Sequence, residues 1–247
     1  MDSSGGSKIA KDGFKNEKDI ANKFINWEKD IEAQQWLITM GNKLEEIEYV
    51  YAEVLHGYKT DVQVQVTIKL KKIIDAQNLQ IKLVSNIKGF NQIDKRWIKN
   101  YAEMWNIPED IVELLKYYTG EKIPYKKNTR DNRRMFMDEF SNEEQEKILE
   151  YFEQNKMLII LDLVKGRGKF AAEWILVAQR LDDTLRWTLK PINIAINHYS
   201  DGNVEITARG NLKIGRITMQ RKGGDAGRDT AKMLQFKVDP TELFDVN

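Results

Sequence analysis

The sequence has no cysteine and only two histidines, His56 and His198. A disulfide scaffold, a thiolate metal site and a histidine-rich metal centre are therefore excluded. No apolar run approaches the roughly 18 residues of a membrane-spanning helix. The start of the chain, residues 1–6, is small and polar and lacks the apolar stretch of a signal peptide. We therefore expect a soluble, cytoplasmic protein with no membrane partner.

The sequence also lacks the patterns of a nucleotide-binding glycine loop and of a Ser-His-Asp catalytic site. The segment Gly166-Arg167-Gly168 places a cation between glycines, but no Gly-x-Gly-x-x-Gly or P-loop pattern follows it. We interpret it as a connection between strands. Neither histidine lies in a recognisable nucleophile context, which disfavours Ser-His-Asp catalysis.

The charges are unevenly distributed, although the net charge is only +1. In the net charge, acidic residues between positions 138 and 153 offset the basic residues between positions 122 and 134. Any one such stretch is as often plain solvated surface, but three together favour a polyanionic partner. The basic residues fall into three groups: Lys82, Lys88, Lys95, Arg96 and Lys99; Lys122, Lys126, Lys127, Arg130, Arg133 and Arg134; and Lys213, Arg216, Arg221, Lys222 and Arg228.

Apolar residues near the N-terminus follow a helical spacing. Ile20, Phe24, Trp27 and Ile31 recur every three or four positions, which predicts an amphipathic helix over residues 13–31. The same stripe, extended backwards, includes Glu17. A carboxylate on a buried face needs a partner such as a metal ion or a cation. The alternative is that Glu17 lies in a solvated first helical turn, where acids suit the helix dipole.

Two stretches alternate between apolar and polar residues, as half-buried strands do. They cover residues 60–68 and 78–84. If these strands are neighbours, Asp61, Gln80 and Lys82 share one polar face. A helix over residues 43–55 is predicted to lead into the first of them.

The rest of the chain predicts one mixed α/β domain, because no linker rich in proline or glycine interrupts it. Ser141 and Glu144 form a capping-box pattern before a helix. The predicted helices cover residues 91–105, 109–118, 143–154 and 192–199. The predicted strands cover residues 157–164, 174–179, 204–208, 212–220 and 233–238.

The combination of Asp61, eighteen intervening residues and Gln80-Ile81-Lys82 carries the strongest chemical signal. Phosphodiester hydrolysis needs a divalent cation, and Mg²⁺ prefers oxygen ligands. Asp61 offers a carboxylate, Gln80 an amide oxygen and Ile81 its backbone carbonyl. Lys82 can stabilise charge on the scissile phosphate. On spacing alone, a solvated strand face with no catalytic role is the more common explanation.

This pattern resembles the PD-(D/E)xK nuclease motif in its variant with glutamine at the second position. Longer strings resemble a type II restriction endonuclease of that superfamily that cuts GCGC, in the same order along nearly the whole chain. Thr60 stands where that relative has serine, and residues 1–6 depart from it. The similar strings are residues 10–19 (AKDGFKNEKD), 89–95 (GFNQIDK), 133–137 (RRMFM), 220–225 (QRKGGD) and 239–245 (DPTELFD).

The resemblance implies an α/β fold with a mixed central sheet flanked by helices, and Mg²⁺-dependent cleavage of GCGC in double-stranded DNA after the first G. It implies metal ligation by Asp61, Gln80, Ile81 and Glu17, with Lys82 as the catalytic lysine. It implies a single endonuclease domain over residues 1–247, with the catalytic core mainly in 1–105 and DNA recognition in 106–247. A monomer or weak homodimer and a cognate methyltransferase are expected.

Two segments are predicted to contact DNA. Phe90 can act as a wedge between bases, and its neighbours can read base edges. The alternatives are a core role for Phe90 and a plain hairpin turn at residues 220–225. The candidates are Phe90, Asn91, Gln92, Lys95, Arg96, Gln220, Arg221, Lys222 and Asp225.

Two other functions remain open. A structure-specific repair nuclease of the same superfamily would prefer branched DNA, and a non-catalytic DNA-binding protein would have lost the acid or the lysine.

Overall fold

The structure is a computed structural model that describes residues 4–55, 63–70, 74–87, 89–182, 184–224 and 227–246, with side chains from Lys15 onward except that of Gln63. Contacts divide the chain into two compact units. Unit 1 comprises Met1–Asn91, Val164–Ala195 and Asp239–Asn247; unit 2 comprises Gln92–Leu163 and Ile196–Val238. Whether both act as one endonuclease domain stays a prediction. No helix in the described part of the chain is long and apolar enough to cross a membrane.

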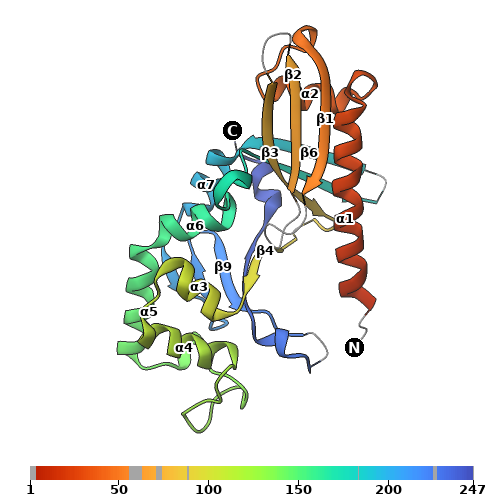
Figure 1. Ribbon diagram of the computed structural model, residues 1–247. Coiled ribbons are helices and arrows are strands. Elements are labelled where there is room, and N and C mark those ends of the chain that lie inside the picture. Colours follow the sequence, from red (N-terminus) through yellow and green to blue (C-terminus); the bar gives the residue numbers. More distant parts are fainter. Residues whose placement is uncertain are drawn as a thin grey trace. The chain divides into compact units, whose positions relative to one another are not determined.

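Unit 1 is built on a mixed sheet, as the sequence predicted (Figure 1). Its strands lie in the order β1 (Ile47–Leu55), β2 (Gln63–Leu70), β3 (Ile74–Val84), β5 (Trp174–Leu181) and β6 (Thr184–Pro191). All neighbours are antiparallel except β3 and β5, which are parallel. The alternation of β2 leaves Val64, Val66 and Ile68 fully buried.

Two helices bury their apolar stripes against unit 1's hydrophobic cluster. Helix α1 (Ser4–Ile25) packs on β1, β2 and β3 through residues that include Ile20 and Phe24. The predicted helix over 13–31 ends earlier, because Ile31 begins a second helix, α2 (Ile31–Thr39). Asp30 caps α2, its carboxylate accepting a hydrogen bond of 3.0 Å from the backbone N–H of Ala33.

The predicted helix over residues 43–55 is wrong, because residues 47–55 form β1. Val50 and Ala52 are buried, whereas Tyr49 and Tyr51 are exposed, which is the alternation of a strand rather than a helical stripe. The antiparallel ladder with β2 supplies the backbone hydrogen bonds.

Unit 2 contains a second sheet with helices packed beside it. Its strand order is β4 (Asn91–Arg96), β10 (Leu234–Val238), β9 (Ile217–Arg221), β8 (Leu212–Ile214) and β7 (Val204–Ile206). The helices are α3 (Ile98–Trp105), α4 (Glu109–Thr119), α5 (Asn142–Gln154) and α6 (Lys156–Val164). Helix α7 (Ile192–Ser200) runs from unit 1 into unit 2.

Aromatic side chains form the centre of unit 2. Tyr101 stacks on Trp105 with 4.8 Å between ring centroids, and Phe236 meets both rings edge-on. The indole N–H of Trp105 donates a hydrogen bond of 2.9 Å to buried Asp162. This contact fixes α6 against α3.

Two further predictions in this part of the chain are wrong. Residues 91–96 form β4, so the predicted helix over 91–105 is helical only from Ile98, at α3. Residues 157–164 belong to α6 and not to a strand. Ile159, Ile160, Leu163 and Val164 are buried at helical spacing, which the uninterrupted apolar run concealed.

The remaining predicted elements are present, with small shifts at their ends. Helices α4, α5 and α7 match the predictions, and Ser141 and Glu144 form the capping box of α5. Strands β5, β7 and β10 also match. The predicted strand over 212–220 is a hairpin of β8 and β9 instead. Gly215 turns the chain there with a positive φ of 56°, and a Cβ would meet the Tyr199 carbonyl oxygen at 2.4 Å.

Candidate active site

Strand β3 holds the Gln-x-Lys pair in the middle of the unit 1 sheet. Gln80 is 1% exposed and Lys82 5% exposed, and both alternate with Leu79 and Ile81, which pack in the cluster under α1. The pair therefore shares the face of β3 that points away from that cluster. A lysine is almost never this buried unless it has a partner or a function.

The same face of β3 carries a buried polar residue that the sequence analysis missed. Asn78 lies two positions before Gln80 on β3. The alternation of side chains along the strand therefore indicates that both residues share one face. Its side-chain amide donates to the carbonyl oxygens of Lys169 and Ala171 at 3.0 and 3.2 Å. Its oxygen accepts a hydrogen bond of 3.0 Å from Gln65. This network fixes β3 to β2 and to the segment before β5.

Glu17 lies on the buried side of α1 and is 8% exposed. Because α1 begins at Ser4, Glu17 is not in a solvated first turn, and that alternative is wrong. Glu17 is one turn before Ile20, on the helix that covers the Leu79 side of the sheet. Its presence at the same site as Gln80 and Lys82 stays a prediction.

Asp61 lies outside the described residues. The nearest described residue of β2 is Gln63, which pairs with Gln80 across the antiparallel ladder. On the other side of β3, Gln80 and Lys82 pair with Ile175 and Val177 of β5. Ile81 is buried between them on the opposite face, so only its backbone carbonyl can serve as a ligand.

A polar contact fixes the segment that follows β3. The amide of Gln179, on β5, donates to the carbonyl oxygens of Asn86 and Ile87 at 2.6 and 3.2 Å. Its own oxygen accepts a hydrogen bond of 2.7 Å from Arg186. This segment leads to Phe90, which is 62% exposed, so the alternative of a core role for Phe90 is wrong.

The residues after Phe90 open strand β4 rather than a helix. Asn91 and Gln92 are half-buried at its start. Lys95 is also half-buried, and Arg96 donates a hydrogen bond of 3.0 Å from Nε to the carboxylate of buried Asp94. Asp94 thus orients Arg96, a role that the sequence did not indicate.

The second predicted contact segment ends strand β9. Gln220 and Arg221 are its last residues, and Lys222 continues the pairing because its backbone N–H bonds to Met233. Gly223 follows with a positive φ of 64°. Asp225 lies outside the described residues.

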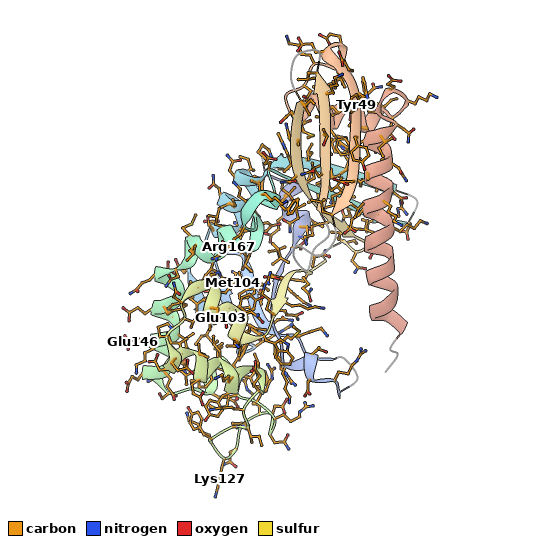
Figure 2. All side chains as sticks on the ribbon, in the orientation of Figure 1. Tyr49, Glu103, Met104, Lys127, Glu146 and Arg167 are labelled. Carbon is orange, nitrogen blue, oxygen red and sulfur yellow. The ribbon has the colours of Figure 1, made fainter. Side chains whose placement is uncertain are left out.

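Several basic side chains of residues 122–134 form ion pairs with acidic residues. Lys122 pairs with Glu113, Arg130 with Asp138, and Arg133 with Asp131. Lys127 is exposed at the end of this loop (Figure 2). The stretch is therefore less positive than its sequence suggested.

A family model, that of the R.HinP1I restriction endonuclease, matches residues 40–244. The chain belongs to the R.HinP1I restriction endonuclease family. Membership implies a site-specific nuclease. The matched residues include the Asp…Gln-x-Lys pattern and all predicted DNA-contact segments. No curated protein matches the chain.

The fold also resembles that of a solved restriction endonuclease, MspI in complex with its cognate DNA. The TM-score is 0.62 at 15% sequence identity, over 90% of this chain and 87% of the MspI chain. At that identity the likeness concerns the fold, which is that of a PD-(D/E)xK restriction endonuclease. The R.HinP1I family member described here therefore has the α/β architecture that the sequence predicted.

Restriction endonucleases of this kind generally use Mg²⁺. Among the described residues, no three His, Cys, Asp or Glu side chains gather as a metal cluster. The donors predicted from the sequence are of another kind: the Gln80 amide, the Ile81 carbonyl and one carboxylate each from Glu17 and Asp61. All are oxygens, which suits a hard ion, and both Gln80 and Glu17 are buried. The donor chemistry fits Mg²⁺.

Proposed function

We propose that this chain is a Mg²⁺-dependent type II restriction endonuclease that hydrolyses double-stranded DNA at a short palindromic, CG-containing site. We propose GCGC as that site, with cleavage after the first G. The observation that carries the proposal is buried Lys82, two residues after buried Gln80 on one face of β3, in a member of a restriction endonuclease family. Action on DNA in the cytoplasm is part of the same proposal.

The proposed active site combines residues of β2, β3 and α1. The described pairing of β2 with β3 ends at Gln63 and Gln80, and Asp61 joins the proposed site on the sequence motif. We therefore assign the carboxylate of Asp61 and the amide oxygen of Gln80 to metal binding. Glu17 and the Ile81 carbonyl complete the proposed ligand set.

In the proposed reaction, Mg²⁺ would supply charge neutralisation and an acidified water. Lys82 would hold its ammonium group beside the scissile phosphate and stabilise the negative charge that develops there. The buried surroundings of Lys82 strengthen that interaction, because a low dielectric weakens electrostatic forces less than water does. Phe90, exposed after β3, would enter the base stack.

The decisive experiment is a digest of unmethylated plasmid with the pure protein, with and without Mg²⁺, followed by sequencing of the fragment ends. Discrete ends at one tetranucleotide are expected. Lys82→Ala and Asp61→Ala should each lower the cleavage rate by at least about a hundredfold. Cuts only at forks or flaps would favour a repair nuclease, and binding without cleavage would favour a non-catalytic DNA-binding protein.

Two partners are also proposed. The enzyme would act as a monomer or weak homodimer. Sedimentation with and without DNA measures this oligomeric state. A cognate methyltransferase would protect host DNA, so methylation of the recognition site should block cleavage in the same digest.

A further inference from the structure

Tyr118 of unit 2 contacts Arg134 and also the strand that ends in Arg221. The guanidinium carbon of Arg134 lies 5.8 Å from the ring centroid of Tyr118, at the end of α4. The hydroxyl of Tyr118 contacts the carbonyl oxygen of Met219 at 3.2 Å, on β9 two residues before Arg221. Tyr118 therefore connects the loop of Arg134 to the strand end of Arg221.

The loop that carries Arg134 is fixed in place. The backbone N–H of Met135 donates to the Tyr117 carbonyl oxygen at 2.9 Å. The guanidinium carbon of Arg134 lies 3.9 Å from the ring centroid of Phe136. The Arg134 side chain is only 15% exposed. Its charge is thus held at one position by aromatic contacts, which suit a planar guanidinium.

The neighbouring carboxylates are engaged by other arginines. Asp138 pairs with Arg130, and Asp131 receives two hydrogen bonds of 2.9 Å from Arg133. Arg134 reaches the same Asp131 only at 4.0 Å. Within the described part of the chain, the buried Nε of Arg221 has no hydrogen-bond partner. Asp131 acts electrostatically on three guanidinium groups of the described residues, those of Arg133, Arg134 and Arg221, which we call the arginine cluster.

The surroundings of this cluster disfavour positive charge. Burial lowers the pKa of Arg134, and the nearby charges of Arg130 and Arg133 lower it further. Burial also lowers the pKa of Arg221, as do the charges of Arg134 and Arg133. Arginine stays protonated nonetheless, so the repulsion persists in the folded protein. An anion placed between the guanidinium groups would remove it.

We propose that the arginine cluster is a binding site for a DNA backbone phosphate, and this proposal rests on the function proposed above. A phosphate is favoured over a guanine edge because guanine is neutral and would leave the like charges uncompensated. The forked donors of arginine also match phosphate oxygens. The cluster fixes the position of the duplex and does not read its sequence.

The first test measures binding of a fluorescein-labelled duplex in EDTA, where cleavage is absent, over a series of salt concentrations. One duplex contains GCGC and a second of equal length does not. Arg134→Gln and Arg221→Gln should each weaken binding to both duplexes about tenfold and reduce the slope of log K against log salt by about 1. Lys147→Gln is the control, because Lys147 is exposed on α5 and pairs with Glu143, and it should bind like wild type.

A second measurement uses the anion alone. Pyrophosphate should raise the melting temperature of the wild type and of Lys147→Gln, and should have less effect on Arg134→Gln and Arg221→Gln. The melts also show that each variant is folded. Arg134→Lys keeps the charge and should retain most of the salt slope if Arg134→Gln proves unstable.

Three outcomes would overturn the phosphate site. A loss confined to the GCGC duplex, at unchanged salt slope, would indicate a guanine contact. Unchanged binding by folded Arg134→Gln and Arg221→Gln would leave the cluster purely structural. A pyrophosphate effect that all variants share would place the anion elsewhere. Failure of the wild type to bind either duplex would contradict the proposed function, while the pyrophosphate melts would still test the anion site.

Discussion

The side-chain amide of Gln179 donates a hydrogen bond of 2.6 Å to the backbone carbonyl oxygen of Asn86. Gln179 lies on β5 and is 1% exposed, whereas Asn86 lies in the segment that follows β3. The contact fixes the backbone between Lys82 and exposed Phe90. Asn86 and Ile87 are exposed, so water can replace the lost donor, and each hydrogen bond of the buried Gln179 side chain contributes about 0.5–1.5 kcal/mol.

Gln179→Leu should therefore lower the free energy of unfolding by about 1–3 kcal/mol. It removes the donor to Asn86 and the acceptor for Arg186 while keeping the side chain's size. Urea denaturation measures the change. Arg180→Ala, at the exposed neighbouring position, is the control and should change stability by less than about 0.5 kcal/mol. Equal effects of the two substitutions would contradict the role of this hydrogen bond.

The same contact shows what sequence reasoning could not reach. Gln179 and Asn86 are 93 residues apart, and no local pattern pairs them. By contrast, Gln80 and Lys82 were predicted to share a face because alternation along a strand is local. The burial of both residues was not predictable, since it depends on what packs over the sheet.

The errors in secondary structure have a similar cause. Leu44, Ile47, Tyr51 and Val54 fit a helical spacing, but the ladder with β2 makes residues 47–55 a strand. The apolar run over 157–164 fits a buried strand or a buried helix equally well. Where only one periodicity fits, as in α4 and α5, the prediction was confirmed.

Gln80→Glu should increase the stabilisation of the protein by Mg²⁺. A carboxylate at this buried position is costly without a metal and favourable with one, because Mg²⁺ prefers charged oxygen ligands. Melting temperatures should therefore fall in EDTA and recover on addition of Mg²⁺, more than in the wild type.

Gln65→Glu is the matched control for this variant. Gln65 lies on neighbouring β2 and bonds to Asn78, so a carboxylate there should gain little from Mg²⁺. A metal response of Gln80→Glu no larger than that of Gln65→Glu would exclude Gln80 as a ligand.

Glu17→Gln should weaken Mg²⁺ binding, whereas Gln80→Glu should strengthen it. The side chain keeps its shape in α1 but loses its charge, so the protein should fold normally and respond less to Mg²⁺ in the same melts. The Mg²⁺ concentration for half-maximal cleavage should rise. Glu28→Gln, at an exposed position, serves as control. An unchanged metal requirement in Glu17→Gln would show that Glu17 is only a structural residue of α1.

Asp30 should make the stability of unit 1 sensitive to acid. Partial burial raises the pKa of Asp30, but hydrogen bonds from Lys23 and from the Ala33 backbone outweigh it, and the pKa lies below its usual value. A carboxylate with a lowered folded-state pKa contributes stability above its unfolded pKa, and this contribution is lost as the pH falls through the folded value. The loss should therefore occur below about pH 4.

Two substitutions at Asp30 separate its charge from its cap. Asp30→Asn retains an N-cap acceptor but loses the ion pair with Lys23, whose Nζ lies 2.8 Å from the Asp30 carboxylate. Asp30→Ala loses both and should be less stable than Asp30→Asn by about 0.5–2 kcal/mol at neutral pH. The stability difference between wild type and Asp30→Asn, measured by urea denaturation, should shrink as the pH falls below about 4, because the wild-type carboxylate is then neutralised. A difference that stays constant down to that pH would mean that Lys23, which also contacts Glu32 at 2.7 Å, gains nothing from Asp30.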